Sequence, residues 1–222
     1  MGMDLTSYYH VYAVNDWPRI VHAHLDALEE SGLGSQLSGF FLGVVGRPAE
    51  RRRVLHEVSA RVPVKVVAEA DQGWEQVTLN ALWRAPKAPR GAVLYAHTKG
   101  VSKSPPSDLR EAWRRSMTQA VVIGWRRCVD LLQDHDLVGC HWLTPERWSH
   151  VPNFGDKPYF AGNFWWATTD WLRGLPKPTG GSKGRWDAEP WVGSGPVPRV
   201  VDLAPGWPGP DTFVTASGGD GG

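Results

Sequence analysis

The sequence predicts a single α/β domain with a mainly parallel central sheet flanked by helices. Short apolar runs alternate with segments of helical length over the first 100 residues. Four predicted strands separated by three predicted helices are typical of βαβ units, whose strands lie parallel in one sheet. The chain has 222 residues, which is long enough to bury a substantial core.

The first strand is predicted at residues 10–15, a β-branched and aromatic run. The helix after it begins at Asp16, because an acceptor side chain followed by a proline in the first turn favours a helix start. Its apolar residues keep helical spacing to Leu28, and Gly32 ends it. The remaining elements of the first half are strands at 40–45, at 64–68 and from 93 onward, and helices at 48–60 and 75–83.

The second half is predicted to contain one long helix and two further strands. In order, the elements are a polar loop at 102–107, a helix at 109–133, a strand at 137–142, a loop at 144–158, a strand at 160–167 and a helix at 169–174. The loop between the two strands is longer than ordinary connections, which makes it a candidate functional loop. The domain is expected to cover residues 8–203, and the Pro/Gly-rich tail at 204–222 is expected to be partly disordered.

Composition narrows the class of protein. Lys plus Arg (24) nearly balance Asp plus Glu (23), so no overall positive field requires a nucleic-acid partner. The two cysteines are too few for a disulfide framework and favour reduced thiols. No segment has the apolar core of a signal peptide or the roughly 20 apolar residues of a membrane span. We therefore expect a cytoplasmic protein without a membrane span.

The apolar run that starts at Val93 stops abruptly in His97, Thr98, Lys99 and Gly100. Ligands of open α/β sheets bind beyond the carboxyl ends of the strands, so this is the first place to look for chemistry. The sequence has no G-x-G-x-x-G after the first predicted strand, no P-loop, no G-x-S-x-G elbow and no zinc pattern. These absences leave α/β enzymes that bind a nucleotide without a glycine fingerprint.

Four motifs, taken in order, carry a resemblance to a known family. They are Tyr95-Ala-His-Thr-Lys-Gly100, Trp113-Arg-Arg-Ser-Met117, Phe160-Ala-Gly-Asn-Phe-Trp-Trp-Ala167 and Arg185-Trp-Asp-Ala-Glu-Pro-Trp191. Over residues 8–193 the chain resembles a group of small bacterial and phage glycosyltransferase-like proteins with the GT-A fold. The resemblance implies a hexosyltransferase-type enzyme that binds a nucleotide-diphosphate sugar at the carboxyl edge of the sheet.

The chain departs from the usual GT-A pattern at one position. GT-A enzymes end the fourth strand in an Asp-x-Asp that holds a divalent metal against the donor diphosphate, whereas His97-Thr98-Lys99 stands here. Lys99 supplies a point charge, His97 can donate a hydrogen bond or ligate a metal, and Gly100 allows close approach of the backbone. We hypothesise that this loop replaces some or all of the work of a Mn²⁺ or Mg²⁺ ion.

The resemblance places acid/base candidates near the end of the domain. Removal of the acceptor proton needs a carboxylate or His beside the acceptor hydroxyl. Glu189 is the preferred base and Asp187 the second choice, with His97 as a further catalytic candidate. The alternative is that these carboxylates cap a helix or pair with Arg185.

Further residues are candidates for the two substrate sites. Asn15 and Asp16 follow the first strand, where this fold meets the donor, although Asp16 can also cap the helix. Arg114 is a candidate phosphate contact, and an exposed helix arginine is the alternative. On a strand, Asn163 and Trp165 would share one face, so these two are the favoured acceptor contacts. Trp166 is a further acceptor-site candidate, although on a strand it would point the other way, toward the core.

Three classes of acceptor or function stay open. The first is a sugar on a polysaccharide or glycoprotein. The second is a 5-hydroxymethylpyrimidine base in DNA, as in phage genome modification, with the basic segments 51–53, 126–127 and 183–185 on the phosphates. The third is a non-catalytic carbohydrate-binding module that uses stacked tryptophans, of which the chain has 13.

Overall fold

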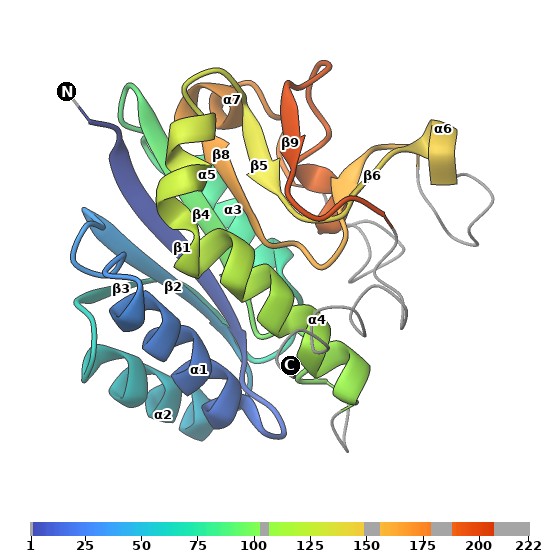
Figure 1. The fold of residues 1–222 in the computed structure, drawn as a ribbon. Helices are drawn as coiled ribbons and strands as arrows, with labels where there is room; N and C mark the ends of the chain where they lie inside the picture. Colours follow the sequence, from blue (N-terminus) through green and yellow to red (C-terminus); the bar gives the residue numbers. More distant parts are fainter. Residues whose placement is uncertain (1, 103–106, 149–155, 179–187, 207–222) are drawn as a thin grey trace, which may run out of the picture.

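The computed structural model describes residues 2–102, 107–148, 156–178 and 188–206. It confirms the predicted fold class, with a seven-stranded sheet in the order β3-β2-β1-β4-β8-β5-β9 between two layers of helices (Figure 1). The strands of this sheet are β1 (Asp4–Tyr12), β2 (Gly39–Val45), β3 (Val64–Ala70), β4 (Gly91–His97), β5 (Leu137–Gly139), β8 (Trp165–Thr168) and β9 (Val200–Asp202).

The sheet is parallel except around β8. β1 pairs in parallel with both β2 and β4, β2 pairs in parallel with β3, and β5 with β9. β8 runs antiparallel between β4 and β5. The carboxyl ends of β1 and β4 therefore lie side by side, with His10 of β1 in register with His97 of β4.

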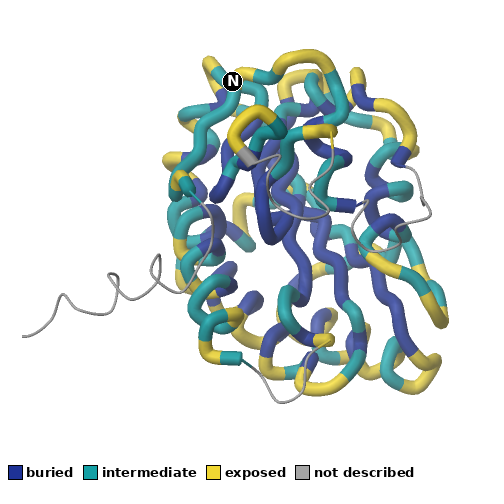
Figure 2. Tube along the Cα trace, turned by 90° about the vertical axis from the view of Figure 1, so that its right-hand side faces the viewer, coloured by how far each residue is buried: buried dark blue, intermediate teal, exposed yellow. Residues whose placement is uncertain are grey.

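Helices cover both faces of the sheet. One face packs against α1 (Trp17–Glu30), α2 (Pro48–Ser59), α4 (Asp108–Thr118), the π-helix η1 (Gln119–Ile123) and α5 (Trp125–Leu131). The other packs against α3 (Gln76–Arg84), α7 (Thr169–Arg173) and the 3₁₀ helix η3 (Glu189–Trp191). Figure 2 shows the buried strands enclosed by partly exposed helices and loops. No described helix is long and apolar enough to cross a membrane.

A smaller pair of strands and a short helix extend from the main sheet. β6 (Trp142–Leu143) and β7 (Tyr159–Phe160) pair in antiparallel fashion, and α6 (Pro145–Trp148) lies within the predicted long loop. Residues 103–106, 149–155 and 207–222 lie outside the described part, so the predicted tail and its disorder stay predictions.

Two predicted elements, the first strand and the long helix, have different bounds in the structure. β1 spans Asp4–Tyr12 rather than 10–15, because the chain turns at Val14 and Asn15 adopts a φ of 50°. The predicted helix at 109–133 is divided by η1 and Gly124 into α4 and α5. A Cβ at Gly124 would lie 2.6 Å from the Ala120 carbonyl oxygen, so the break requires glycine.

The two predicted strands of the second half were also too long. The predicted strand at 137–142 ends at Gly139, and His141 has a φ of 60°. Only the last part of the predicted strand at 160–167 joins the main sheet as β8, after Asn163 with a φ of 56°. Left-handed residues interrupt both apolar runs, and hydrophobic periodicity does not detect such residues.

Candidate active site

A cluster of four polar side chains lies at the carboxyl end of β4. This sheet-edge cluster consists of Glu75, Tyr95, His97 and Asn163. His97 Nε2 lies 2.9 Å from the Gly162 carbonyl oxygen, and His97 Nδ1 lies 3.4 Å from Glu75 Oε1. Both contacted atoms are acceptors, so the geometry favours a proton on each ring nitrogen, that is, an imidazolium ion. Because only 11% of the His97 side chain and 14% of Glu75 are exposed, this is a largely buried ion pair.

Glu75 is the acceptor on which the rest of the cluster converges. Its Oε2 accepts hydrogen bonds from Asn163 Nδ2 at 2.6 Å and from the Tyr95 hydroxyl at 3.2 Å. Asn163 Oδ1 in turn accepts from the Trp165 indole at 2.7 Å. Burial, and then the neighbouring Glu75 charge, raise the pKa of Tyr95 well above its usual value. Tyr95 therefore stays protonated and acts as a donor to Glu75.

The histidine beside the cluster is neutral. His10 is buried, and its Nδ1 lies 2.7 Å from the Thr78 hydroxyl. Burial first, and then repulsion by His97, lower the pKa of His10 to about 3. His10 therefore adds no positive charge to this part of the sheet edge.

Lys99 and Glu189 form a second ion pair at the same edge. Lys99 Nζ lies 3.3 Å from Glu189 Oε1 and 4.2 Å from the centroid of the Trp113 ring. The two charged side chains are 16% and 14% exposed. Glu189 is in η3, so the chain brings together two residues that are 90 positions apart. The structure thus places the predicted base beside the predicted phosphate-binding lysine.

Gly162 connects the two ion pairs. Its carbonyl oxygen accepts from His97, and a Cβ at this position would lie 3.1 Å from the Trp113 ring and 2.6 Å from Met117 Sδ. Its φ is 92°, a conformation that favours glycine. Close packing on α4 therefore requires glycine at this point.

Three predicted donor-site residues hold loops in place. The Thr98 hydroxyl accepts from the Tyr12 backbone N–H at 2.9 Å, and Asn15 Nδ2 donates to the Val101 carbonyl oxygen at 2.8 Å. Gly100 has a φ of 86°. These contacts fasten the loop after β1 to the loop after β4. Any contact of Asn15, Thr98 or Gly100 with a donor stays a prediction.

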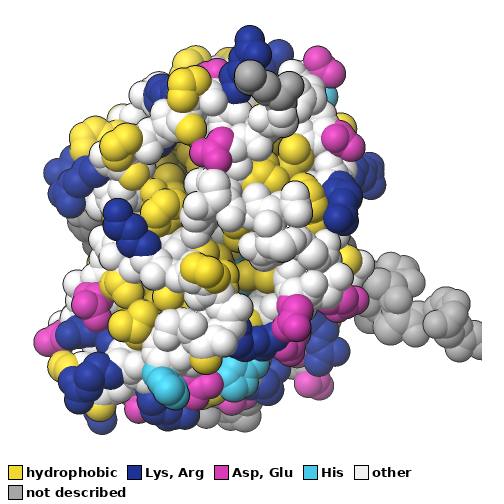
Figure 3. All heavy atoms as spheres, turned by 90° about the vertical axis from the view of Figure 1, so that its left-hand side faces the viewer, with side chains coloured by type: hydrophobic (Ala, Val, Ile, Leu, Met, Phe, Trp, Pro, Cys, Tyr) yellow, Lys and Arg dark blue, Asp and Glu magenta, His cyan; other side chains and the backbone are white. Residues whose placement is uncertain are grey.

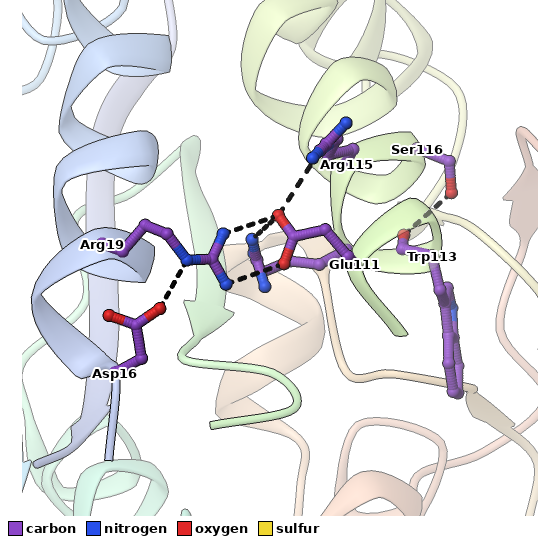
Figure 4. Close-up of polar contacts among 7 residues, drawn as sticks. Asp16, Arg19, Glu111, Trp113, Arg115 and Ser116 are labelled. Atoms are coloured by element: carbon purple, nitrogen blue, oxygen red, sulfur yellow. Dashed lines mark hydrogen bonds and ion pairs between the residues drawn. The ribbon is translucent and has the colours of Figure 1, made fainter. Parts of the chain in front are cut away.

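Asp16 and Arg114 belong to a charged network between α1 and α4. Figure 4 labels three of its members, Asp16, Arg19 and Glu111. Arg19 donates to Asp16 at 2.6 Å and to both Glu111 oxygens at 3.0 Å. Although burial alone raises the pKa of Glu111, hydrogen bonds from Arg19 and Arg114 outweigh it and bring that pKa to about 2. Asp16 occupies the N-cap position of α1 without a capping hydrogen bond from its side chain. The alternative of an exposed helix arginine is wrong, because Arg114 is buried against Glu111, and its contact with a phosphate stays a prediction.

The two tryptophans proposed as acceptor contacts are core residues. Trp165 and Trp166 are both fully buried. Trp165 stacks on Tyr95 with centroids 5.1 Å apart, and the Trp166 indole donates to the Val121 carbonyl oxygen at 2.7 Å. Neither ring has exposed surface for a sugar in this structure, so we assign both a packing role. Asp187, the second candidate base, lies outside the described residues.

The described residues contain no preformed group of three protein ligands for a divalent metal ion. Within residues 2–102, 107–148, 156–178 and 188–206, no group of three or more His, Cys, Asp or Glu side chains could hold one. His97, the predicted candidate ligand, directs both ring nitrogens at acceptor atoms. A doubly protonated ring has no lone pair to offer a metal.

Some arginines of the basic segments considered for DNA contacts have partners within the protein. Arg51 pairs with Asp71 and Glu69, and Arg126 lies over the Trp125 ring. On the face shown in Figure 3, acidic and basic side chains are interspersed rather than gathered into one basic patch. Residues 183–185 lie outside the described part. These contacts give no support to the DNA alternative.

Sequence reasoning missed Glu75, Tyr95 and Trp113 as parts of the site. A signal existed for Glu75, because it follows the third strand and therefore lies at the same sheet edge as His97. Nothing in the sequence pattern distinguishes Tyr95 from the other residues of β4, all of which are buried.

Comparisons with known proteins give a family and remote structural similarities. Rv0371c in complex with manganese, from Mycobacterium tuberculosis H37Rv, is 16% identical with a TM-score of 0.47, over 92% of this chain and 90% of that chain. Staphylococcus aureus TarS 1-349 in complex with UDP-GlcNAc is 11% identical with a TM-score of 0.41, over 95% and 60%.

A third solved structure is 4-diphosphocytidyl-2C-methyl-D-erythritol synthase from Anaerococcus prevotii DSM 20548. It is 10% identical with a TM-score of 0.39, over 65% of this chain and 57% of that chain. No curated protein matches the sequence. Residues 8–180 match the family described as a domain of unknown function, DUF8361. The chain therefore belongs to the DUF8361 family.

Proposed function

We propose that the chain is a GT-A-like glycosyltransferase that moves a sugar from a nucleotide-diphosphate donor to an acceptor hydroxyl. The observation that carries this proposal is the pairing of Lys99 with Glu189 over Trp113, at the carboxyl edge of a parallel sheet. A phosphate-binding cation and a carboxylate base are the two groups that glycosyl transfer needs from the protein. A sugar of a polysaccharide or glycoprotein is the proposed acceptor.

In the proposed reaction, the acceptor oxygen forms a bond to the anomeric carbon of the donor sugar. The bond between that carbon and the diphosphate oxygen breaks, and the diphosphate leaves with the electron pair. Glu189 takes the proton of the acceptor hydroxyl. Lys99 stabilises the negative charge that develops on the leaving diphosphate. This attraction is stronger in a partly desolvated site than in water.

The sheet-edge cluster holds neighbouring groups of the site in place. Glu75 fixes His97 and Asn163, and His97 fixes the carbonyl group of Gly162. The imidazolium adds positive charge to the edge on which the diphosphate would bind. We therefore propose His97 as an electrostatic contributor and Glu75 as its positioning residue. Fixed charges of this kind need no reorganisation during the reaction.

We further propose that Lys99 and His97 replace some or all of the work of a divalent ion, because no group of three or more His, Cys, Asp or Glu side chains in the described part could hold one. The test is incubation of the full chain with a panel of nucleotide-diphosphate sugars, UDP-GlcNAc included, with measurement of the released nucleoside diphosphate. Release is expected in excess chelator. Activity that is lost in chelator and restored by Mn²⁺ contradicts the metal-free part of the proposal.

Variants at the lysine separate catalysis from binding alone. Lys99→Met removes the charge with a similar chain length, and it is expected to lower release of the nucleoside diphosphate by about 10²-fold. Lys177→Met, at an exposed lysine, is the matched control. Saturable sugar binding without release from any donor favours the carbohydrate-binding module instead.

A further inference from the structure

A cavity of about 350 Å³ lies between α1 and α4, on the face of the sheet opposite α3. Much of its wall is apolar, with Ile20 and Ala27 from α1 and Phe164 from the segment before β8. The bridge from Arg19 to Glu111, drawn in Figure 4, joins the two helices beside this α1–α4 cavity. The volume is within the range of small-molecule pockets, which begins at about 300 Å³.

The helical wall of the cavity changes from α4 to the π-helix η1. Thr118, Gln119 and Ile123 line the cavity, and the last two are the end residues of η1. π-Helices are rare, and they occur frequently at functional sites. The local backbone geometry therefore adds to the size of the cavity as a reason to look for a ligand there.

Arg114 is the most deeply buried of the arginines that line the cavity. Only 7% of its side chain is exposed, against 75% for Arg115. Its Nη2 donates to Glu111, whereas its Nε and Nη1 make no hydrogen bond in the described part of the chain. These two nitrogens are not among the fully buried atoms without a partner, to which the Tyr9 hydroxyl belongs. They therefore keep accessible surface through which a ligand can reach them.

The charges around Arg114 leave one positive charge in excess. Three guanidinium groups share two carboxylates; the groups are those of Arg19, Arg114 and Arg115, and the carboxylates are those of Asp16 and Glu111. Both oxygens of Glu111 already accept from Arg19 at 3.0 Å. A buried charge without a full counter-charge is costly, so an anion beside Arg114 would stabilise this group.

The acidic residues of the rim do not supply that anion. Asp26 and Glu30 are exposed, and Asp26 pairs with Arg61 at 2.7 Å. Water and salt screen exposed charges, so these two carboxylates act weakly on a buried guanidinium. The deficit at Arg114 is left for a ligand.

We propose that the α1–α4 cavity binds an organic monocarboxylate. Its carboxylate would accept from Arg114, since guanidinium groups form strong, charge-assisted hydrogen bonds with carboxylates. Its apolar body would lie against Ile20, Ala27 and Phe164. One excess positive charge matches a monoanion rather than a phosphate dianion. This site does not rest on the proposed transfer reaction, because neither Lys99 nor Glu189 lines it.

The test compares three acids with their own amides, which have nearly the same shape and no charge. The pairs are benzoate and benzamide, phenylacetate and phenylacetamide, and hexanoate and hexanamide. In titration calorimetry of the full chain, at least one acid should bind saturably, and its amide should bind at least about tenfold more weakly because the charge-assisted bond is lost. Absence of saturable binding by all three acids, or equal affinity for acid and amide, overturns the site. Tighter binding of inorganic phosphate than of any acid overturns the choice of a carboxylate.

Variants locate the binding. Arg114→Gln removes the buried charge and should weaken acid binding at least about tenfold. Arg127→Gln, at an exposed arginine of α5 outside the cavity, is the matched control and should bind like the unmodified chain. Unchanged affinity in Arg114→Gln overturns the role of this residue. Thermal unfolding of each variant shows that it is folded before titration.

A second variant leaves Arg114 intact, in case loss of its pair with Glu111 unfolds the chain. Ala23 is exposed and lines the cavity, so Ala23→Leu adds bulk there at little cost to the fold and should abolish saturable acid binding. Ala49→Leu, at an exposed alanine of α2, is its control and should bind normally. Unchanged affinity in Ala23→Leu places the binding elsewhere and overturns the proposal.

Discussion

Two polar regions border His97, and they differ in how their buried groups are satisfied. In the sheet-edge cluster, Glu75 accepts from Tyr95 and Asn163 and pairs with His97. In the second region, which consists of the stacked rings of Tyr9 and His24, the Tyr9 hydroxyl and the His24 nitrogens are buried and have no partner among the described residues. The protein itself satisfies the groups of the first region, whereas the second contains buried polar groups without a hydrogen bond.

This difference in hydrogen bonding has a different consequence for each region. A satisfied, charged cluster is organised before substrate arrives and so suits stabilisation of developing charge. Buried neutral groups without a partner instead lower the stability of the fold, because nothing replaces the hydrogen bonds that they make with water in the unfolded chain.

The largest effect is expected at the proposed base. Glu189→Gln keeps the shape of the side chain and removes its basicity, so turnover should fall by about 10²–10⁴-fold with little change in KM. Release of nucleoside diphosphate measures it. Asp170→Asn, at an exposed carboxylate, is the control. Undiminished turnover in Glu189→Gln removes this residue from the reaction.

The next effect concerns the stability of the sheet-edge cluster. Glu75→Ala leaves the His97 charge and two buried donors without their acceptor, so the free energy of unfolding should fall by about 3 kcal/mol. Urea denaturation measures it. Asp170→Ala breaks the exposed pair with Arg173 and should cost less than about 1 kcal/mol. Equal losses in the two variants would show that the Glu75 pair is not special.

The same chemical change in both regions gives the sharpest contrast. Tyr95→Phe deletes a hydroxyl that donates to the Glu75 carboxylate, and it should destabilise the fold by about 2 kcal/mol. Tyr9→Phe deletes a buried hydroxyl without a partner, so it should leave the free energy of unfolding unchanged or raise it, by up to about 1–3 kcal/mol. Urea denaturation of both variants compares them; a large loss in Tyr9→Phe would mean that a partner satisfies this hydroxyl in the unliganded protein.

The smallest effect is a dependence on pH. Burial lowers the pKa of His24 to about 3, against about 6.5 in an unfolded chain. Between these values the unfolded chain binds more protons, so stability falls as pH falls from about 6.5 toward 3. His24→Phe should flatten this slope by up to about 1.4 kcal/mol per pH unit. His10 keeps its own contribution in both proteins, and parallel stability curves would contradict the assignment to His24.

Much of the sheet edge at which the candidate site lies could be predicted from the sequence. Alternating apolar and helical segments predicted the parallel half of the sheet, and the polar stop after β4 predicted the position of His97 and Lys99. The motif at 185–191 predicted Glu189 as the base, and this residue lies 3.3 Å from Lys99. These features are local, because strand ends and motif residues are readable from neighbouring residues.

The remaining parts of the site depend on contacts between distant segments. Glu75 meets Asn163 across 88 positions, and the partners of Trp165 and Trp166 decided that neither ring faces solvent. The left-handed φ of Asn163 interrupted a run that periodicity had read as one strand. Packing of the whole chain sets such contacts, and single-sequence patterns do not contain them.

The sequence by itself therefore determined the order of strands and helices and the edge of the sheet that bears Lys99. The tertiary structure alone decided which groups are satisfied there and which buried groups, such as the Tyr9 hydroxyl and the His24 nitrogens, have no partner among the described residues. The physical reason is that backbone pattern follows from the periodicity of nearby residues, whereas burial and hydrogen-bond partners arise only when distant segments pack together.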